Sequence, residues 1–174
     1  RVERTPEHFN QAAQKVIEKG YKAMKFDPFG NGNLELTRDE FKKSIDLIEA
    51  VNHAIEGKGQ MFIEMHGRFA PHQAVEIASA IERFNPGWIE EPCRPMDVDA
   101  LKYVMDHTRI PIATGERLYS APDYNRLFDN RLANIIQPDI SQCGGMLEVK
   151  KIASAAECRS MMVSLHNVGG IVAT

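Results

Sequence analysis

Apolar residues follow two alternating patterns along this chain. Short apolar or β-branched runs such as "MFIEMH" and "NIIQP" are separated by longer segments in which apolar residues recur every three or four positions. The first pattern is typical of buried strands and the second of amphipathic helices. The short runs predict strands at 21–27, 61–66, 87–90, 111–115, 133–138 and 161–165. The periodic segments predict helices at 6–20, 37–56, 71–84, 97–107, 121–129 and 146–158.

The strict alternation of apolar strands and helices predicts an α/β fold with a parallel sheet and right-handed crossovers. No Pro/Ser-rich linker interrupts the pattern, so residues 1–174 form one domain. A closed eight-stranded barrel takes about 250 residues, whereas 174 residues give six predicted strands. We therefore expect a portion of a TIM-type (β/α) barrel from a longer protein. Its two unpaired sheet edges should make the chain less stable than its parent, or self-associating.

An ionisable residue lies at or just beyond the end of each of the last five predicted strands. Glu64, Glu90 and Glu116 recur at a constant interval of 26 residues, and Asp139 and His166 follow after 23 and 27 more residues. Parallel barrels bring the carboxyl ends of their strands to one mouth, where the chemistry takes place. A single glutamate at a strand end is usually a solvated surface group. Three at one interval instead predict converging oxygen ligands for Mg²⁺ and a metal-assisted acid–base enzyme.

Composition excludes several other classes of protein. The chain is 43% hydrophobic and 26% charged with a net charge of −3, as in ordinary globular domains, so its charge predicts no nucleic-acid or membrane-surface partner. No apolar run approaches the roughly 18 residues that a membrane span requires. Cys93, Cys143 and Cys158 are odd in number and lack C-x-x-C spacing, which predicts free thiols in a reducing, cytoplasmic compartment.

Five motifs, in this order and spacing, resemble the barrel of the enolase superfamily. They read "EMHGRF", "WIEEP", "ATGERLY", "QPDISQCGG" and "SLHNVGG", and the resemblance extends over residues 22–173. Within the superfamily they are most similar to the mandelate racemase/muconate lactonizing enzyme group, and there to galactonate and gluconate dehydratases. The resemblance implies an acid-sugar substrate and a homo-oligomer assembled through the barrels. It also implies an N-terminal capping domain, which nothing in this chain resembles.

The same resemblance assigns roles to individual residues. Glu64, Glu90 and Glu116 would be the Mg²⁺ ligands, and Glu91 would not be a ligand because neighbouring strand residues point to opposite faces. His166 and Asp139 match a His–Asp dyad in which the carboxylate orients the imidazole. His66 matches a second histidine of the dehydratases. Two residues along a strand share a face, so we expect His66 beside the metal site.

One departure from the superfamily concerns the end of the strand at 21–27. Many racemases and cycloisomerases carry a Lys-x-Lys pair there, whereas this chain has Lys25, Phe26 and Asp27. An aspartate in the second place removes the usual ammonium base from that side. The departure favours chemistry by His166 and His66, and we expect Lys25 to pair with Asp27 because they share a strand face.

The implied reaction is removal of the proton next to a carboxylate, followed by loss of the 3-hydroxyl to give a 2-keto-3-deoxy acid. His166 would be the base and His66 the acid that protonates the leaving hydroxyl. The alternatives are a racemase, epimerase or cycloisomerase that uses the same site, and a catalytically incomplete barrel fragment.

Several further side chains are candidates for substrate contact, each with a structural alternative. Arg68 and Arg117 could bind substrate or instead hold the glutamates in place. Asn167 could bind a hydroxyl group or form a turn. Lys25 and Asp27 complete the set of candidate substrate-binding residues.

Overall fold

The computed structural model describes residues 3–169 and contains one parallel sheet of six strands. The strands follow one another in sequence order across the sheet: β1 Ala23–Phe26, β2 Gln60–Glu64, β3 Trp88–Glu90, β4 Ile112–Thr114, β5 Ile135–Ile136 and β6 Met162–Val163. The helices are α1 Pro6–Glu18, α2 Arg38–Ile55, α3 Pro71–Ile81, α4 Val98–His107, α5 Ala121–Asn130 and α6 Met146–Glu157, with a short 3₁₀ helix η1 at Glu82–Phe84. The predicted fold class, six parallel strands alternating with helices, is confirmed.

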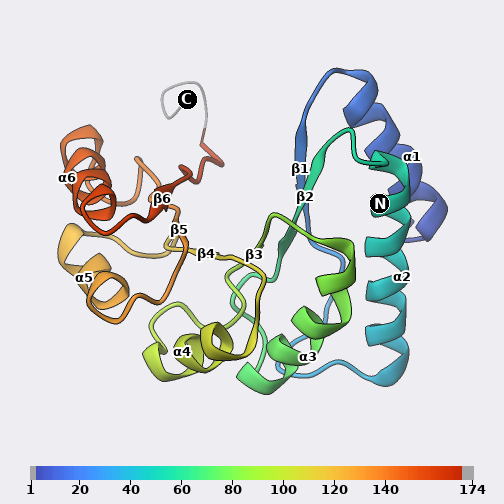
Figure 1. Cartoon of the computed structure of the whole chain (residues 1–174), viewed down its shortest axis with the longest axis horizontal. Helices are drawn as coiled ribbons and strands as arrows, with labels where there is room; N and C mark the ends of the chain where they lie inside the picture. The colour runs from blue at the N-terminus through green and yellow to red at the C-terminus, as the bar shows by residue number, and fades with distance from the viewer. Residues whose placement is uncertain (1–2, 170–174) are drawn as a thin grey trace.

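The sheet curves into an arc, and the helices lie along its outer side (Figure 1). Ile63, Ile89 and Ile112 point from neighbouring strands into the buried layer between sheet and helices, where none of the three has exposed surface. The opposite, concave side carries Phe62 and Trp88, whose rings stack with centroids 3.6 Å apart. This is the arrangement of a segment of a (β/α) barrel, because alternate strand residues face the helices and the barrel interior.

Local signals in the sequence fix where the helices start. Thr37 caps α2 by accepting the Glu40 N–H, and the Glu40 carboxylate accepts the Thr37 N–H, which is a complete capping box. Pro6 and Pro71 begin α1 and α3, where a missing N–H costs nothing. These caps fix where each helix begins and hence how long each connecting loop is.

The strands are shorter than their apolar runs predicted. The run at 61–66 pairs only to Glu64, because His66 has a left-handed backbone with φ +53° and leaves the ladder. The predicted helix 71–84 ends at Ile81 and continues as the 3₁₀ turn. Cys93, Cys143 and Cys158 are free thiols, as predicted, with Cys158 exposed.

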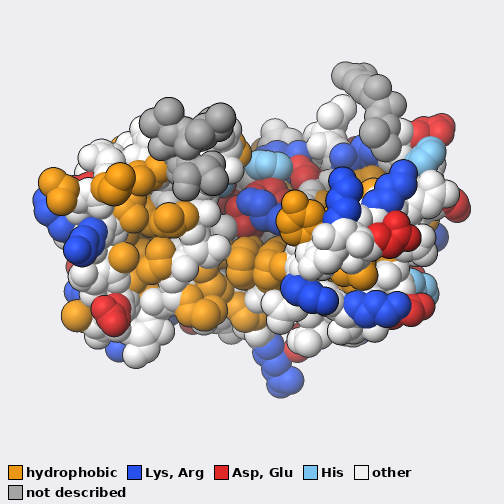
Figure 2. All heavy atoms as spheres, turned by 90° about the horizontal axis from the view of Figure 1, so that it is seen from above, with side chains coloured by type: hydrophobic (Ala, Val, Ile, Leu, Met, Phe, Trp, Pro, Cys, Tyr) orange, Lys and Arg blue, Asp and Glu red, His pale blue; other side chains and the backbone are white. Residues whose placement is uncertain are grey.

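Hydrophobic side chains are frequent on the half of the molecule that holds α5, α6 and β6, as the face in Figure 2 shows. Met162, Val163 and Leu165 are 62%, 38% and 53% exposed at β6, which is an edge strand in the part of the chain that the structure describes. Among residues 3–169, no helix has both the length and the hydropathy required to cross a membrane.

Candidate metal and acid–base site

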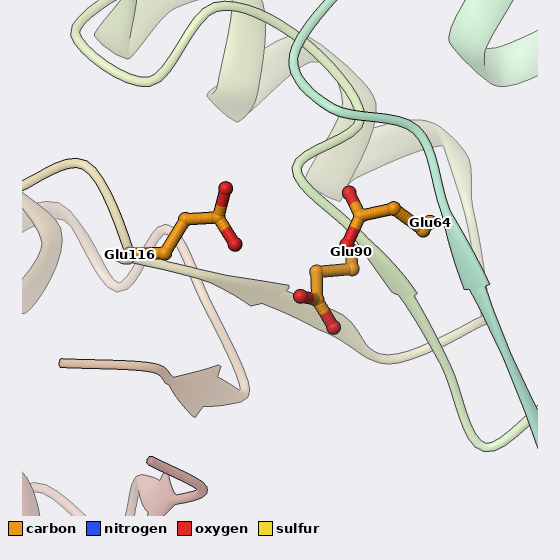
Figure 3. Close-up of side chains that lie close together, drawn as sticks. All are labelled: Glu64, Glu90 and Glu116. Atoms are coloured by element: carbon orange, nitrogen blue, oxygen red, sulfur yellow. The ribbon is translucent and has the colours of Figure 1, made fainter. Parts of the chain in front are cut away.

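Three glutamate side chains converge at the carboxyl ends of β2, β3 and β4, as the sequence predicted. Glu64 and Glu90 end their strands and are register partners, and Glu116 lies two residues beyond β4. Each offers one oxygen, and these oxygens all lie within 4.8 Å of one another. Figure 3 shows the carboxylate of Glu116 facing the other two across the mouth. We call these three residues the glutamate cluster.

The charges in the glutamate cluster interact strongly. Burial raises the pKa of Glu64 to about 8, and the neighbouring Glu90 adds to this shift. Burial also acts on Glu90, but hydrogen bonds from Glu64, Lys25 and Gln137 outweigh it and lower its pKa. Three carboxylates this close, two of them buried, form an oxygen-only donor set. Such a set fits a hard divalent cation such as Mg²⁺, which would offset the repulsion.

Lys25 lies against the glutamate cluster, which corrects the expected pairing of Lys25 with Asp27. Its ammonium donates to Glu64 Oε2 at 3.0 Å and also to Glu90 Oε1. The reason is the sheet register: Lys25 is opposite Phe62 on β2, and Glu64 follows two residues later on the same face. Burial tends to lower the pKa of Lys25, but the bonds and charges of the two glutamates raise it overall.

Asp139 and His166 form the predicted dyad. His166 Nδ1 lies 2.8 Å from Asp139 Oδ2, while His166 Nε2 lies 3.2 Å from Glu116 Oε2. Asp139 is almost fully buried, yet hydrogen bonds from Ser141 and His166 outweigh that burial and lower its pKa. An ionised Asp139 can only accept, so Nδ1 of His166 carries a hydrogen, and Nε2 faces the glutamate cluster.

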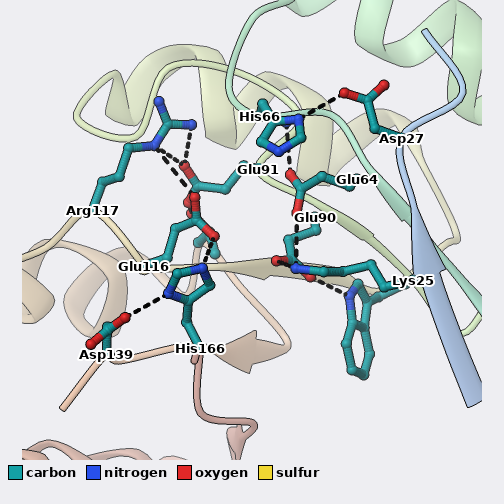
Figure 4. A network of polar contacts seen from close by, with 12 residues as sticks. Lys25, Asp27, Glu64, His66, Glu90, Glu91, Glu116, Arg117, Asp139 and His166 are labelled. Atoms are coloured by element: carbon teal, nitrogen blue, oxygen red, sulfur yellow. Dashed lines mark hydrogen bonds and ion pairs between the residues drawn. The ribbon is translucent and has the colours of Figure 1, made fainter. Parts of the chain in front are cut away.

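His66 lies beside the glutamate cluster, but not because two residues on one strand share a face. It follows the end of β2 in a left-handed turn, and its backbone N–H donates to Glu64 Oε1 at 2.7 Å. Its Nδ1 lies 2.8 Å from Asp27 Oδ2, the atom that also accepts from Arg68 Nη2 at 2.8 Å. Figure 4 shows the glutamates between His66 on one side and His166 on the other.

Glu91 and Arg117 form a separate pair behind the glutamate cluster. The Glu91 carboxylate is fully buried and accepts bonds from the Thr114 hydroxyl, Gly115 N–H and Arg117 Nε. Burial raises the pKa of Glu91 despite these bonds. Glu91 lies outside the cluster, as expected, and Arg117 takes the supporting role that the sequence left as its alternative, 3.9 Å from Glu116.

Comparison with known proteins identifies the group to which this architecture belongs. The family model described as "Enolase C-terminal domain-like" matches residues 8–174. The chain belongs to this enolase C-terminal domain-like family. It is 35% identical over 169 residues to the D-gluconate/D-galactonate dehydratase of Picrophilus torridus, and the match covers 97% of this chain and 43% of that protein. It is 37% identical over 169 residues to the D-gluconate dehydratase of Thermoproteus tenax, with 97% and 34% covered.

Solved structures of the enolase superfamily are also similar to this chain. A member of the superfamily from Salmonella Typhimurium is 32% identical with a TM-score of 0.92, and the match covers 97% of this chain and 46% of that one. A mandelate racemase/muconate lactonizing enzyme from Jannaschia sp. CCS1 is 34% identical with a TM-score of 0.90, covering 97% and 44%. The chain therefore spans less than half the length of these proteins.

Several partners in this enolase-type site were not predicted from the sequence. Trp88 on β3 donates its indole N–H to Glu90 Oε2 at 3.0 Å. Gln137 also bonds to Glu90, and its buried Oε1 has no hydrogen-bond partner in the described residues. Trp88 could have been found, because it stands two residues before Glu90 on the same strand face. Ser141 could have been found as the residue two after an aspartate in a turn.

The remaining candidates for substrate contact take structural partners in this member of the family. Arg68 donates to Met65 O and Gly30 O as well as to Asp27. Asn167 Oδ1 accepts from Gly169 N–H at 3.1 Å, which is a turn contact of the kind that the sequence left as one of two alternatives.

Proposed function

We propose that this chain is the catalytic barrel portion of a Mg²⁺-dependent dehydratase that converts acid sugars such as gluconate or galactonate into 2-keto-3-deoxy acids. The observation that carries the proposal is the pair of histidines on either side of the glutamate cluster, each hydrogen-bonded to its own aspartate. Dehydration requires a base at one carbon and an acid at the next, and two separately held imidazoles can supply both. The names of the relatives from Picrophilus torridus and Thermoproteus tenax support the substrate class.

The chain's own residues divide the reaction between them. His166 Nε2 takes the proton from C2, and Asp139 stabilises the imidazolium that forms. His66 then gives a proton to the 3-hydroxyl, which leaves as water, and the resulting enol becomes the 2-keto-3-deoxy acid. Mg²⁺ held by Glu64, Glu90 and Glu116 would supply positive charge for the substrate carboxylate, on which negative charge builds as the proton leaves.

Lys25 and Asp27 favour dehydration over racemisation. A two-base racemase needs a second base opposite His166, and Lys25 instead faces the glutamate cluster while Asp27 is bonded to His66 and Arg68. The group opposite His166 is therefore an imidazole bonded to a carboxylate, which stabilises the imidazolium form that can give a proton to a leaving hydroxyl.

Proton NMR in D₂O with Mg²⁺ and D-gluconate, D-galactonate, D-xylonate and aldaric acids tests the proposal. A 2-keto-3-deoxy product from one of them is the expected result. His166→Asn should abolish it, whereas His53→Gln, an exposed histidine on α2, should leave the rate unchanged. Deuterium at C2 without loss of water would replace the dehydratase with an epimerase. No reaction with any acid, also after a capping domain is supplied, would overturn the proposal.

A further inference from the structure

We propose that Asp27 and Arg68 are positioning residues that form, with His66, a second carboxylate–histidine dyad on the opposite side of the glutamate cluster from Asp139 and His166. Neither residue would then contact substrate. The role deepens the proposed function, which places an acid at His66 beside Asp27 but gives Arg68 no part and does not say which ring nitrogen carries the hydrogen.

The contacts of Asp27 leave little freedom for its carboxylate. One oxygen, Oδ1, accepts the Phe29 N–H at 2.8 Å, and the other, Oδ2, accepts Arg68 Nη2 at 2.8 Å and lies 2.8 Å from His66 Nδ1. The Asp27 side chain is 21% exposed, whereas that of His66 is 51% exposed. The more buried partner therefore determines the position of the more open one.

Arg68 ties this carboxylate to the loop on each side. Its Nε donates to Met65 O at 3.2 Å and its Nη1 donates to Gly30 O at 2.8 Å, while Nη2 bonds to Asp27. The guanidinium thus joins the turn after β1 to the turn after β2. Three of the five guanidinium N–H groups, one on each nitrogen, are thereby bonded within the chain, which fixes the plane of the group.

The protonation of the ring follows from the acceptors. A carboxylate that bonds to an arginine offers only acceptor sites, so the contact to His66 Nδ1 requires that Nδ1 carries the hydrogen. The ring nitrogen Nε2 is then the one that can exchange a proton with a ligand at the mouth. In both dyads the ring nitrogen that faces the aspartate is Nδ1: Nδ1 of His66 faces Asp27, and Nδ1 of His166 faces Asp139.

The turn also links the ring to the glutamate cluster. His66 has φ +53° and donates its N–H to Glu64 Oε1 at 2.7 Å. Asp27 holds the side chain of His66 while Glu64 holds its backbone. One residue is thus fixed from two strands, which places its Nε2 reproducibly.

Nitrogen-15 NMR of the histidine rings tests the dyad without any substrate or metal. The protein is labelled at histidine, His66 is assigned by its loss in His66→Gln, and spectra are taken at about pH 8.5, above the ordinary histidine pKa of about 6.5. We expect the Nδ1–H tautomer for His66 in the wild type and in Asp27→Glu. We expect conversion to the Nε2–H tautomer in Asp27→Ala and no change in Asp46→Asn, a partly exposed aspartate on α2 that is paired with Lys42.

Two results would overturn the proposal. One is a wild-type His66 in the Nε2–H form, and the other is an Asp27→Ala variant that keeps the wild-type tautomer. If Asp27→Ala does not fold, the nearly isosteric Asp27→Asn decides in its place. The Nδ1–H population should fall in that variant because a neutral amide is a weaker acceptor than a carboxylate.

The catalytic consequence rests on the proposed function, whereas the tautomer does not. With D-gluconate in D₂O, Asp27→Ala should lower the rate of water loss by about 10- to 100-fold, as loss of an orienting partner usually does. Deuterium exchange at C2 by His166 should continue. A parallel fall in both rates would show a merely structural role and overturn the assignment. A wild type that shows the predicted tautomers, yet neither exchanges nor dehydrates any of the acids after a capping domain is supplied, would overturn the proposed function and leave the dyad standing.

Discussion

Two buried carboxylates, Glu64 and Glu90, lie side by side at the ends of neighbouring strands, and the ammonium of Lys25 contacts both. Glu116 brings a third carboxylate within reach of the same point. The ammonium of Lys25 does not balance this many carboxyl groups, and the pKa of Glu64 is raised to about 8 because like charges repel more strongly where water is scarce. Folding therefore places electrostatic strain at this point, and a bound cation would relieve it.

Mg²⁺ should consequently stabilise the folded chain. At 100 times its dissociation constant, a ligand that binds only the native state adds about 2.7 kcal/mol to the free energy of unfolding. Glu116→Gln removes one ligand and should abolish most of the Mg²⁺-induced rise in melting temperature. Glu157→Gln, on the exposed end of α6, is the matched control and should behave as the wild type. An undiminished response in Glu116→Gln, measured by thermal unfolding and calorimetry, would contradict the assignment of this ligand.

Asp139 should make stability depend on pH in the acid range. Its pKa is lowered in the folded state by bonds from Ser141 and His166, so its contribution is complete above the unfolded value of 3.8 and is lost as pH falls through the lower folded value. Asp139→Asn should cost about 1–3 kcal/mol at neutral pH. Urea unfolding should show a smaller loss of unfolding free energy in Asp139→Asn at about pH 3, where the carboxylate of Asp139 begins to be protonated in the wild type as well. An equal cost at both values would contradict this account.

The site residues whose positions could be predicted are those that recur at the interval of one strand–helix unit of the barrel. Glu64, Glu90 and Glu116 could be found because equal intervals place them at equivalent strand ends. The partner of Lys25 could not be found, because it depends on which residues face each other across β1 and β2. That register is set by the packing of both strands against the helices, and no local signal reports it.

At the scale of elements, each strand–helix unit is delimited by its own caps. Thr37 and Glu40 exchange side-chain and backbone hydrogen bonds at the start of α2, the longest helix of the described chain. Such a box satisfies donors that the first helical turn leaves unpaired.

Thr37→Ala should lower the free energy of unfolding by about 1 kcal/mol. Thr37→Ser keeps the hydroxyl acceptor and should stay close to the wild type. Urea unfolding of the three proteins at neutral pH measures the difference. Equal losses in the alanine and serine variants would show that the methyl group, and not the cap, is responsible.

The bounds of the helices could be predicted closely, because capping residues and N-terminal prolines can be recognised in the local sequence. Strand bounds could be predicted less well. The apolar run at 61–66 gives no sign that His66 turns away with a left-handed backbone. The strand at 133–138 pairs only over Ile135–Ile136, because pairing depends on the neighbour as well as on the run itself.

At the scale of the whole molecule, the sheet is an open arc with β1 and β6 at its edges within the described residues. Val163 on β6 is 38% exposed and Met162 is 62% exposed. Unpaired backbone groups beside apolar side chains form a template for association with another chain.

Light scattering coupled to size exclusion should therefore show self-association of this chain that increases with concentration. Val163→Lys should reduce it, because a lysine on an edge strand disfavours pairing. Leu147→Lys on α6, a residue that is 78% exposed, is the matched control and should have little effect. A compact monomer at every concentration would contradict the prediction of an association-prone edge.

The neighbour order of the strands has a consequence for the newly made protein. Within residues 3–169, each strand from β2 to β6 pairs with the strand made just before it, so this sheet can form strand by strand as the chain is synthesised. The strands that carry Glu64, Glu90 and Glu116 are all translated before His166. Domains begin to fold from the N-terminal side during synthesis. The glutamate cluster can therefore form on the ribosome before His166 has been translated. If the glutamate cluster holds the proposed cation, a growing chain would be able to bind it before the proposed base, His166, has been made.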